Sequence, residues 1–159
     1  MLIDIGKILK KGEGISIEFK EARQKLPKNL FETVCAFLNR NGGTILLGVD
    51  DNGKVIGVEP DYAPKLVQQF VTLCNNPQKL LPSFLLYPQI QEYKGKVIIS
   101  AYVPVSSQVH RSGGKVFDRS DEGDFELRTD AQVKKLYNSK NALYSENTIY
   151  PFLYESDFK

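Results

Sequence analysis

Apolar and polar residues alternate with different periods along the chain, and the changes of period mark the predicted elements. Residues 2–11 carry apolar side chains at roughly helical spacing and end in lysines before Gly12, which predicts a short helix that stops at this glycine. Residues 15–21 alternate between apolar and polar, as a half-buried strand does. Glu18 and Lys20 are therefore expected on the polar face of this strand.

The middle of the chain predicts a helix followed by a buried strand. Pro27 is a suitable first residue of a helix, and the apolar stripe that follows it ends at the sequence NRNGG, residues 39–43. The next six residues, TILLGV, form a continuous apolar run, which is typical of a central strand buried on both faces. We interpret the glycine pair of NRNGG as a tight connection between helix and strand rather than as a phosphate-binding loop.

The sequence DDNG, residues 50–53, predicts a hairpin turn after the buried strand. Asn52 and Gly53 can adopt the positive φ angles of a type I′ turn, and residues 54–58 would return as the partner strand. The remaining predicted elements are a helix over residues 61–74, a hairpin of residues 84–93 and 96–105, a weaker strand pair at residues 115–120 and 124–129, and a short helix over residues 130–140 capped by Asp130.

This order of elements predicts an α+β fold, in which a mixed, mostly antiparallel sheet is packed with helices. Residues 1–140 are predicted to form one domain. Residues 141–159 form an aromatic C-terminal tail without a clear period, which would pack on the domain, join two copies, or belong to a linker. The hypothesis of a homodimer rests on the aromatic residues of this tail, Tyr144, Tyr150, Phe152 and Tyr154.

The composition is that of an ordinary globular domain, with 42% hydrophobic and 25% charged residues among 159. The formal net charge of +2 is too small to identify a partner. The N-terminus lacks the pattern of a signal peptide, and no stretch approaches the length of a membrane span. We therefore expect a cytoplasmic protein without a membrane partner.

Cysteine and histidine are rare in the chain. Cys35 and Cys74 occupy apolar helical spacings and are expected as buried free thiols rather than as a disulfide. With one histidine, His110, and no C-x-x-C sequence, a zinc site is not expected, and His110 is interpreted as an exposed loop residue rather than a general base. No P-loop sequence indicates a nucleotide site.

Acidic residues gather at the ends of the predicted strands. Glu13 precedes the first strand, Glu18 lies on it, and Asp50 and Asp51 follow the buried strand. Neighbouring carboxylates can hold Mg²⁺ or Mn²⁺, which activates water and offsets charge during phosphodiester hydrolysis. The same residues fit ordinary roles, since Glu18 can pair with Lys20 and Asp-Asn-Gly is a sequence that turns prefer. The spacing alone favours these ordinary roles.

Two groups of basic residues are candidates for contacts with phosphates. Residues 1–28 contain seven lysines and arginines against four acids, and a second group surrounds the sequence HRSGGK, whose glycines would let backbone amides approach an anion. Such clusters neutralise phosphates, although each alone is more often a solvated surface. Neighbouring acids, Asp124 among them, argue against a uniformly positive face. The predicted nucleic-acid contacts are Lys20, Arg23, Lys25, Lys28, Arg111, Lys115 and Arg119.

The succession IEFKEA, LPK…FETVCAFLNRNGG and TILLGVDDNGKVIGV resembles the Schlafen-type AlbA-like domain, also called divergent AAA, over roughly residues 1–137. The family is described as DNA-binding in bacterial transcriptional regulators, so the resemblance implies a sheet-and-helix fold that binds nucleic acid. The later segment KVFDRS…LRTDAQVKKLY resembles the closing strand and helix of the family. Asp118 stands there where the family pattern has a valine before the arginine that matches Arg119.

In the RNA-cleaving animal members of this family, two glutamates five residues apart and an aspartate after the central strand form a metal-dependent nuclease site. The resemblance maps these acids onto Glu13, Glu18 and Asp51, with Asp50 as the second choice for the aspartate. It maps the basic residue that follows the second glutamate onto Lys20. Bacterial relatives sometimes carry an adjoining ATPase-like or winged-helix region, and no segment of this sequence resembles either.

The sequence therefore predicts a nucleic-acid-binding domain, with DNA as the first expected ligand, of a homodimeric transcriptional regulator. The first alternative is a Mg²⁺- or Mn²⁺-dependent endoribonuclease that uses Glu13, Glu18 and Asp51. The second alternative is a non-catalytic module for protein interaction or dimerisation.

Overall fold

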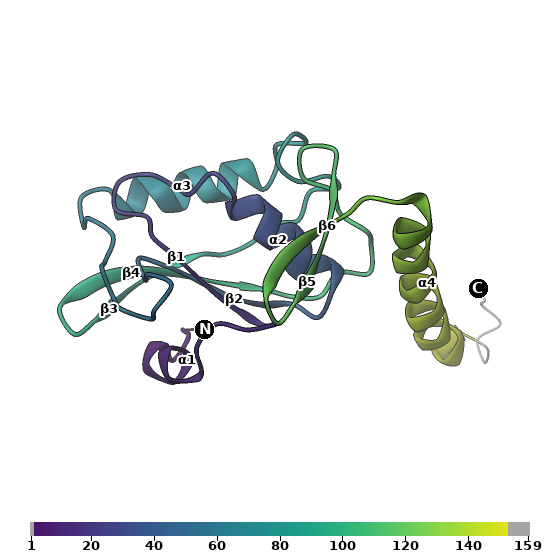
Figure 1. Cartoon of the computed structure of the whole chain (residues 1–159), viewed down its shortest axis with the longest axis horizontal. Helices are drawn as coiled ribbons and strands as arrows, with labels where there is room; N and C mark the ends of the chain where they lie inside the picture. Colours follow the sequence, from purple (N-terminus) through teal and green to yellow (C-terminus); the bar gives the residue numbers. More distant parts are fainter. Residues whose placement is uncertain (1, 153–159) are drawn as a thin grey trace.

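The computed structural model describes the backbone of residues 2–152 and the side chains of residues 2–142. Its elements are α1 (Ile5–Lys11), β1 (Ile17–Lys20), α2 (Leu30–Asn39), β2 (Gly43–Leu47), α3 (Ala63–Leu73), β3 (Gln89–Tyr93), β4 (Lys96–Val103), β5 (Val116–Ser120), β6 (Gly123–Leu127) and α4 (Asp130–Phe152). Helices α2 and α3 cover one face of the central sheet and α1 lies on the other (Figure 1). The β5–β6 ribbon lies against α2, and α4 stands beyond the ribbon at one end of the molecule.

The central sheet has the strand order β1-β2-β4-β3. β1 and β2 run parallel, whereas β4 is antiparallel to both β2 and β3. This arrangement confirms the predicted α+β class with a mixed, mostly antiparallel sheet. β5 and β6 form a separate two-stranded antiparallel ribbon and do not join the central sheet.

The core lies on both faces of the central sheet. Nine of the ten residues of α2 are buried, and they pack with α3 and with the inner face of the sheet. Phe31 and Phe70 join the two helices edge to face, with ring centroids 5.5 Å apart. On the opposite face, Ile5 of α1 packs with Phe19 and Ile98. Every residue of β2 is buried, which confirms the predicted central strand.

The ends of the first two helices confirm one of the boundaries predicted from the sequence and correct another. Asp4 caps the N-terminus of α1, and Gly12, at φ 79°, caps its C-terminus as predicted. The second helix begins at Leu30 and not at Pro27. The carbonyl of Pro27 instead accepts a hydrogen bond from the Leu30 amide, 3.2 Å away, in a turn that precedes the helix.

The turn after β2 differs from the predicted type I′ turn. Gly53 has a φ of 83°, whereas Asn52 does not have a positive φ. The amide of Gly53 donates to the carbonyl of Asp50 at 3.0 Å, and the Asp50 carboxylate accepts from the amides of Asn52 and Lys54, each at 2.9 Å. Because this loop is longer than a two-residue turn, residues 54–58 make isolated bridges with their neighbours instead of a regular strand.

Helix α4 starts with a capping box in place of the predicted cap Asp130, which is its first helical residue. Thr129 Oγ1 accepts from the amide of Gln132 at 3.1 Å, and Gln132 Oε1 accepts from the amide of Thr129 at 3.1 Å. The helix continues to Phe152, well past the predicted end at residue 140. No helix in the described part of the chain combines the length and apolar character needed to cross a membrane.

One face of α4 attaches the helix to the rest of the domain. Val133 and Leu136 pack on the apolar cluster at the open end of the ribbon, and Lys140 follows on the same face. The buried ammonium of Lys140 donates to the carbonyls of Leu38, at 3.0 Å, and Ser106, at 2.6 Å. Burial lowers the pKa of Lys140 to about 8. The side chains of the aromatic tail lie outside the described residues, so the homodimer hypothesis stays a prediction.

Candidate functional site

A buried arginine joins the polar face of β1 to the β5–β6 ribbon. Nη1 of Arg119 lies 2.8 Å from Glu18 Oε1 and 2.7 Å from Asp124 Oδ1. Nη2 donates to the backbone carbonyls of Gly14, at 2.7 Å, and Ile17, at 3.0 Å. Because its side chain is only 1% exposed, Arg119 serves these protein partners and is not placed to contact a polyanion.

Asp124 and Thr33 complete this group, and the sequence analysis gave neither a place in the site. Asp124 is the cross-strand partner of Arg119, and its second carboxylate oxygen accepts a hydrogen bond from Thr33 Oγ1 on α2. The guanidinium carbon of Arg119 lies 4.7 Å from the centre of the Phe37 ring, within the range of a cation–π contact. The pairing of Asp124 with Arg119 could have been predicted from the hairpin register, because residues directly opposite each other in a strand pair interact.

Glu18 and Asp51 lie in the electrostatic surroundings of Glu13. Glu13 Oε2 accepts a hydrogen bond from the amide of Phe19 at 3.0 Å, which holds its carboxylate against β1. Partial burial of this carboxylate raises the pKa of Glu13, and the charges of Glu18 and Asp51 raise it further. The Phe19 amide and the Arg119 charge oppose that rise. We call Glu13, Glu18, Asp51 and Asp124 the acidic site.

Lys20, the last residue of β1, is also held inside the protein. Its ammonium donates to Asn29 Oδ1 at 3.0 Å and lies 3.7 Å from Glu18 Oε2. Its side chain is 7% exposed. Glu18 therefore has a cation beside each of its oxygens, and Lys20 acts as an internal counter-charge.

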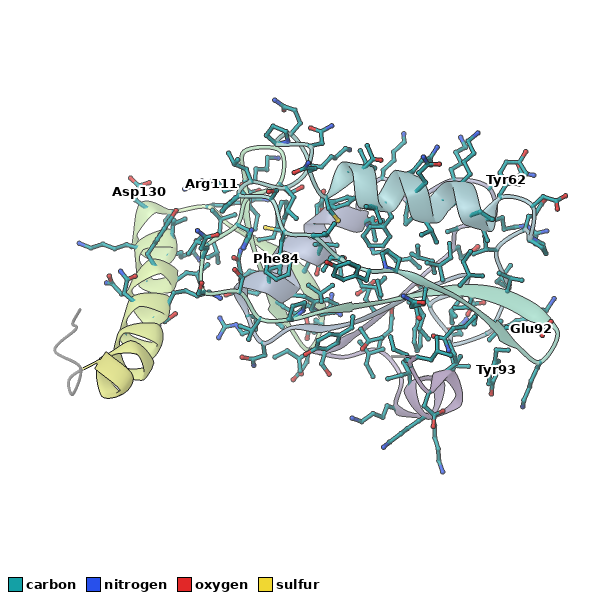
Figure 2. The ribbon with its side chains drawn as sticks, turned by 180° about the vertical axis from the view of Figure 1, so that it is seen from behind. Tyr62, Phe84, Glu92, Tyr93, Arg111 and Asp130 are labelled. Carbon is teal, nitrogen blue, oxygen red and sulfur yellow. The ribbon has the colours of Figure 1, made fainter. Side chains whose placement is uncertain are left out.

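A groove of about 480 Å³ lies between the open end of the ribbon and α4. Figure 2 shows Arg111 beside the start of α4, where Asp130 is labelled. The charged residues that line the groove are Arg111, Lys115, Arg128, Lys134, Glu126 and Asp130. Among these described residues, four cations stand against two carboxylates, so the lining carries an excess of positive charge. We call this feature the basic groove.

The basic groove unites two predicted residues with two that the sequence analysis missed. Arg111 and Lys115 belong to the sequence HRSGGK, in which Gly113 and Gly114, at φ 58° and 77°, form a type I′ turn closed by hydrogen bonds between Ser112 and Lys115. Arg128 and Lys134 come from the end of β6 and from α4. Their approach to HRSGGK depends on how α4 packs, which the spacing of residues along the chain does not specify.

The comparison with protein families places the chain. The family described as Schlafen, AlbA_2 matches residues 13–137, which include the acidic site and the charged residues of the basic groove. The chain belongs to the Schlafen AlbA_2 family. This confirms the resemblance found in the sequence, and it indicates a nucleic-acid-related function.

Two solved structures resemble this Schlafen AlbA_2 domain. The crystal structure of the DIP2311 protein from Corynebacterium diphtheriae aligns with a TM-score of 0.64 at 16% identity over 87% of this chain, which spans 31% of that protein. The second is the solution structure of the N-terminal domain of a protein from Nitrosomonas europaea that is named as related to the ATP-dependent DNA helicase RecG. It aligns with a TM-score of 0.51 at 28% identity, covering 65% of this chain and 74% of that one. The search of curated proteins found no match.

The acidic site of this Schlafen AlbA_2 domain does not fit a metal ion as it is arranged. Among the side chains of residues 2–142, no three from histidine, cysteine, aspartate and glutamate lie close enough to hold one. Arg119 and Lys20 occupy the oxygens of Glu18, and Asp50 serves the turn that it begins. A Mg²⁺ or Mn²⁺ site on Glu13, Glu18, Asp50 and Asp51 therefore stays a prediction without a ligand set in the described geometry.

The other predicted basic contacts of the Schlafen AlbA_2 domain lie in the loop between β1 and α2. Arg23, Lys25 and Lys28 are exposed there. Arg23 has one weak ionic partner, Glu59, at 3.9 Å, and its side chain is 60% exposed. These three residues remain free to meet a polyanion, unlike Lys20.

His110 is buried, so its interpretation as an exposed loop residue is wrong. Its Nδ1 donates to the carbonyl of Pro82 at 2.8 Å, and its Nε2 accepts from Ser106 Oγ at 2.7 Å. Burial lowers the pKa of His110, the hydrogen bond to Pro82 opposes this, and the nearby Lys140 charge lowers the pKa further. The neutral ring links the 106–110 loop to the segment around Pro82, which is a structural role.

Acid should destabilise the domain partly through His110. Because its pKa in the folded state lies below the usual 6.5, the unfolded chain binds the proton more readily, and this histidine's contribution to stability is lost as pH falls from about 6.5 through the folded pKa. The variant His110→Asn keeps a polar group near Nδ1 but does not titrate. We expect it to be less stable at pH 7.5, with the gap to wild type narrowing at pH 5.0 in urea unfolding. A gap that stays constant would contradict this role.

The two cysteines are buried free thiols, as predicted. Burial is the first cause that raises the pKa of Cys35 to about 12, and burial also raises that of Cys74. The Cys35 thiol donates to the carbonyl of His110 at 3.1 Å. Neither thiol is placed or activated to act as a nucleophile, since the reactive form is the thiolate.

Proposed function

We propose that this Schlafen AlbA_2 domain binds nucleic acid through the basic groove. The observation that carries the proposal is the meeting of four cations from three segments, namely Arg111, Lys115, Arg128 and Lys134, around one hollow. Lysine and arginine neutralise backbone phosphates and release counterions, which gives affinity without a demand for one base sequence. Arg128 is well suited to this role because its side chain is 80% exposed and its contact with Glu126 spans 3.5 Å.

Two further points support the proposal. Arg119 and Lys20 are committed to internal carboxylates, whereas Lys115, Arg128 and Lys134 of the groove are exposed, as are Arg23, Lys25 and Lys28. The solved domain from Nitrosomonas europaea belongs to a protein named after a DNA helicase, which is a nucleic-acid enzyme. We propose the loop of residues 23–28 as a second, weaker contact.

The finer role proposed is DNA binding within a transcriptional regulator, which acts as a homodimer. The endoribonuclease alternative is less favoured, because Arg119 and Lys20 already pair with the two carboxylate oxygens of Glu18. Sedimentation of the chain at high concentration tests the dimer, and a single monomeric species would contradict it.

Binding should weaken when the groove loses charge. The double variant Arg128→Gln/Lys134→Gln should reduce affinity for a labelled 20-nucleotide DNA by about tenfold, and should lower the slope of log K against log salt by about two, one for each lost phosphate contact. Fluorescence anisotropy over a salt series measures both. Lys65→Gln, which removes an exposed lysine from α3, is the matched control and should change little.

A binding assay and a cleavage assay on the same protein distinguish the two proposed functions. Unchanged affinity and salt slope in the Arg128/Lys134 double variant would reject the groove as the interface. Incubation of labelled RNA with Mg²⁺ or Mn²⁺ tests the nuclease alternative, with Asp51→Asn as the variant, because Asp51 is exposed and its amide counterpart should fold. Metal-dependent cleavage that this variant abolishes would favour the endoribonuclease.

A further inference from the structure

An exposed aromatic side chain stands among the cations of the basic groove. Tyr137 lines the groove and is 41% exposed, although tyrosine usually buries much of its ring. It follows Lys134 by three residues on α4, so the two side chains are neighbours on the helix surface. A ring with a cation beside it offers one surface for a base and one charge for the phosphate attached to it.

The rest of the groove lining is apolar in its deeper part. Val116 and Leu127 are 1% and 8% exposed, and both belong to the cluster in which Val133 also takes part. Val116 and Leu127 form the buried floor beneath the groove, and the apolar surface open to a ligand comes from the partly buried Val133 and from Tyr137. The faces of nucleobases are suited to such a surface, whereas phosphates are suited to the charged residues around it.

The size of the groove also bears on which nucleic acid it suits. A volume of about 480 Å³ is that of a site for one small molecule, so the hollow has room for a base that has left the stack but not for a stretch of stacked base pairs. In a duplex the faces of the bases are stacked on one another and cannot reach a side chain. In a single strand they are free to stack on aromatic residues.

We infer that the basic groove takes single-stranded nucleic acid, with a base stacked on Tyr137 and the flanking phosphates paired with Arg128 and Lys134. This inference rests on the proposed function, because it names the ligand class of the same groove. It goes beyond that function by requiring the base itself to contribute to affinity. A groove that only paired with phosphates would bind single strands, duplexes and base-free backbones with affinities that differ only through their charge density.

The test compares four labelled probes of equal length by fluorescence anisotropy: single-stranded DNA, single-stranded RNA, duplex DNA, and a strand built of abasic units. Single-stranded DNA should bind about tenfold more tightly than the duplex, and Tyr137→Ala should lose about tenfold in affinity for it. The same substitution should leave affinity for the abasic strand nearly unchanged, because no base is present to stack. Tyr137→Phe should retain the affinity, and the RNA probe shows whether the sugar matters.

Tyr87→Ala is the matched control, since Tyr87 is 72% exposed and lies outside the basic groove. Equal affinity for the single strand and the duplex, with no effect of Tyr137→Ala, would overturn the inference. An equal loss on the abasic and the ordinary strand would overturn it as well. If the Arg128→Gln/Lys134→Gln variant also binds all probes as wild type does, the proposed function itself fails. If that variant weakens binding while Tyr137→Ala does not, only the single-strand inference fails.

Discussion

Replacing Arg119 by leucine should lower the free energy of unfolding by about 3–5 kcal/mol. The substitution removes the shared cation of Glu18 and Asp124, whose side chains are 18% and 15% exposed, and leaves these two carboxylates facing each other. It also removes the donor to the carbonyls of Gly14 and Ile17. An unpaired buried charge costs much more than the loss of one hydrogen bond. Chemical unfolding in urea at pH 7 measures the effect.

Two further variants separate this role from a loss of charge in general. Arg128→Leu removes an arginine that is 80% exposed and should change stability by less than about 0.5 kcal/mol. Arg119→Lys keeps the charge but loses the planar group that reaches two carboxylates and two carbonyls, so it should recover only part of the stability. An Arg119→Leu protein as stable as the Arg128→Leu protein would refute the structural role of Arg119.

Replacing Gly42 by alanine should have the second large effect, a loss of about 3 kcal/mol of unfolding free energy. Gly42 has a φ of 78°, and a Cβ atom there would lie 2.6 Å from the carbonyl oxygen of Val103 and 3.0 Å from the amide nitrogen of Val105. A positive φ costs a non-glycine residue about 1–2 kcal/mol, and overpacking against backbone adds about 1–3 kcal/mol. Thermal and urea unfolding of the variant give the measurement.

Gly95→Ala provides the control for the Gly42 prediction. Gly95 has a φ of 82°, close to that of Gly42, but a Cβ there would meet nothing within 4 Å. This variant should therefore show the backbone strain without the clash, and should cost about 1–2 kcal/mol. Equal losses in the two variants would mean that the close approach of β4 to the NRNGG segment contributes nothing. A loss of nucleic-acid binding without a loss of stability in Gly42→Ala would instead favour a phosphate-binding loop.

The periods of apolar residues were sufficient to predict the fold class and the buried strand β2. Local signals also placed the end of α1 at Gly12 and the turn between β3 and β4, where Lys94 and Gly95 have φ angles of 48° and 82°. These elements were predictable because their causes lie within a few residues of the chain. The predicted type I′ turn after β2 was wrong. The Asp50 carboxylate accepts hydrogen bonds from two amides of a loop that is one residue longer than a type I′ turn, and the sequence Asn-Gly does not reveal this.

The candidate site was less predictable, because its contacts join residues far apart in the sequence. The hydrogen bonds between Arg119 and residues 14–18 span about a hundred positions, and a charged residue in a strand is usually exposed. The burial of His110 likewise depends on a contact with Pro82, which is 28 positions away in another loop. Glu13, Glu18 and Asp51 could be grouped from their spacing and the family resemblance. The position of the Arg119 guanidinium between β1 and the ribbon could not be predicted in this way.

The attachment of α4 by Val133, Leu136 and Lys140 has a thermodynamic consequence for the groove that this helix helps to form. One wall of the groove is α4 and another is the β5–β6 ribbon. A nucleic-acid strand that contacts both walls would therefore bind only the state in which α4 is packed on the ribbon. Whatever free energy the strand gains there must also oppose the detachment of the helix, since a ligand stabilises the state that it binds. A polyanion bound in the groove would thus stabilise the contact between α4 and the ribbon.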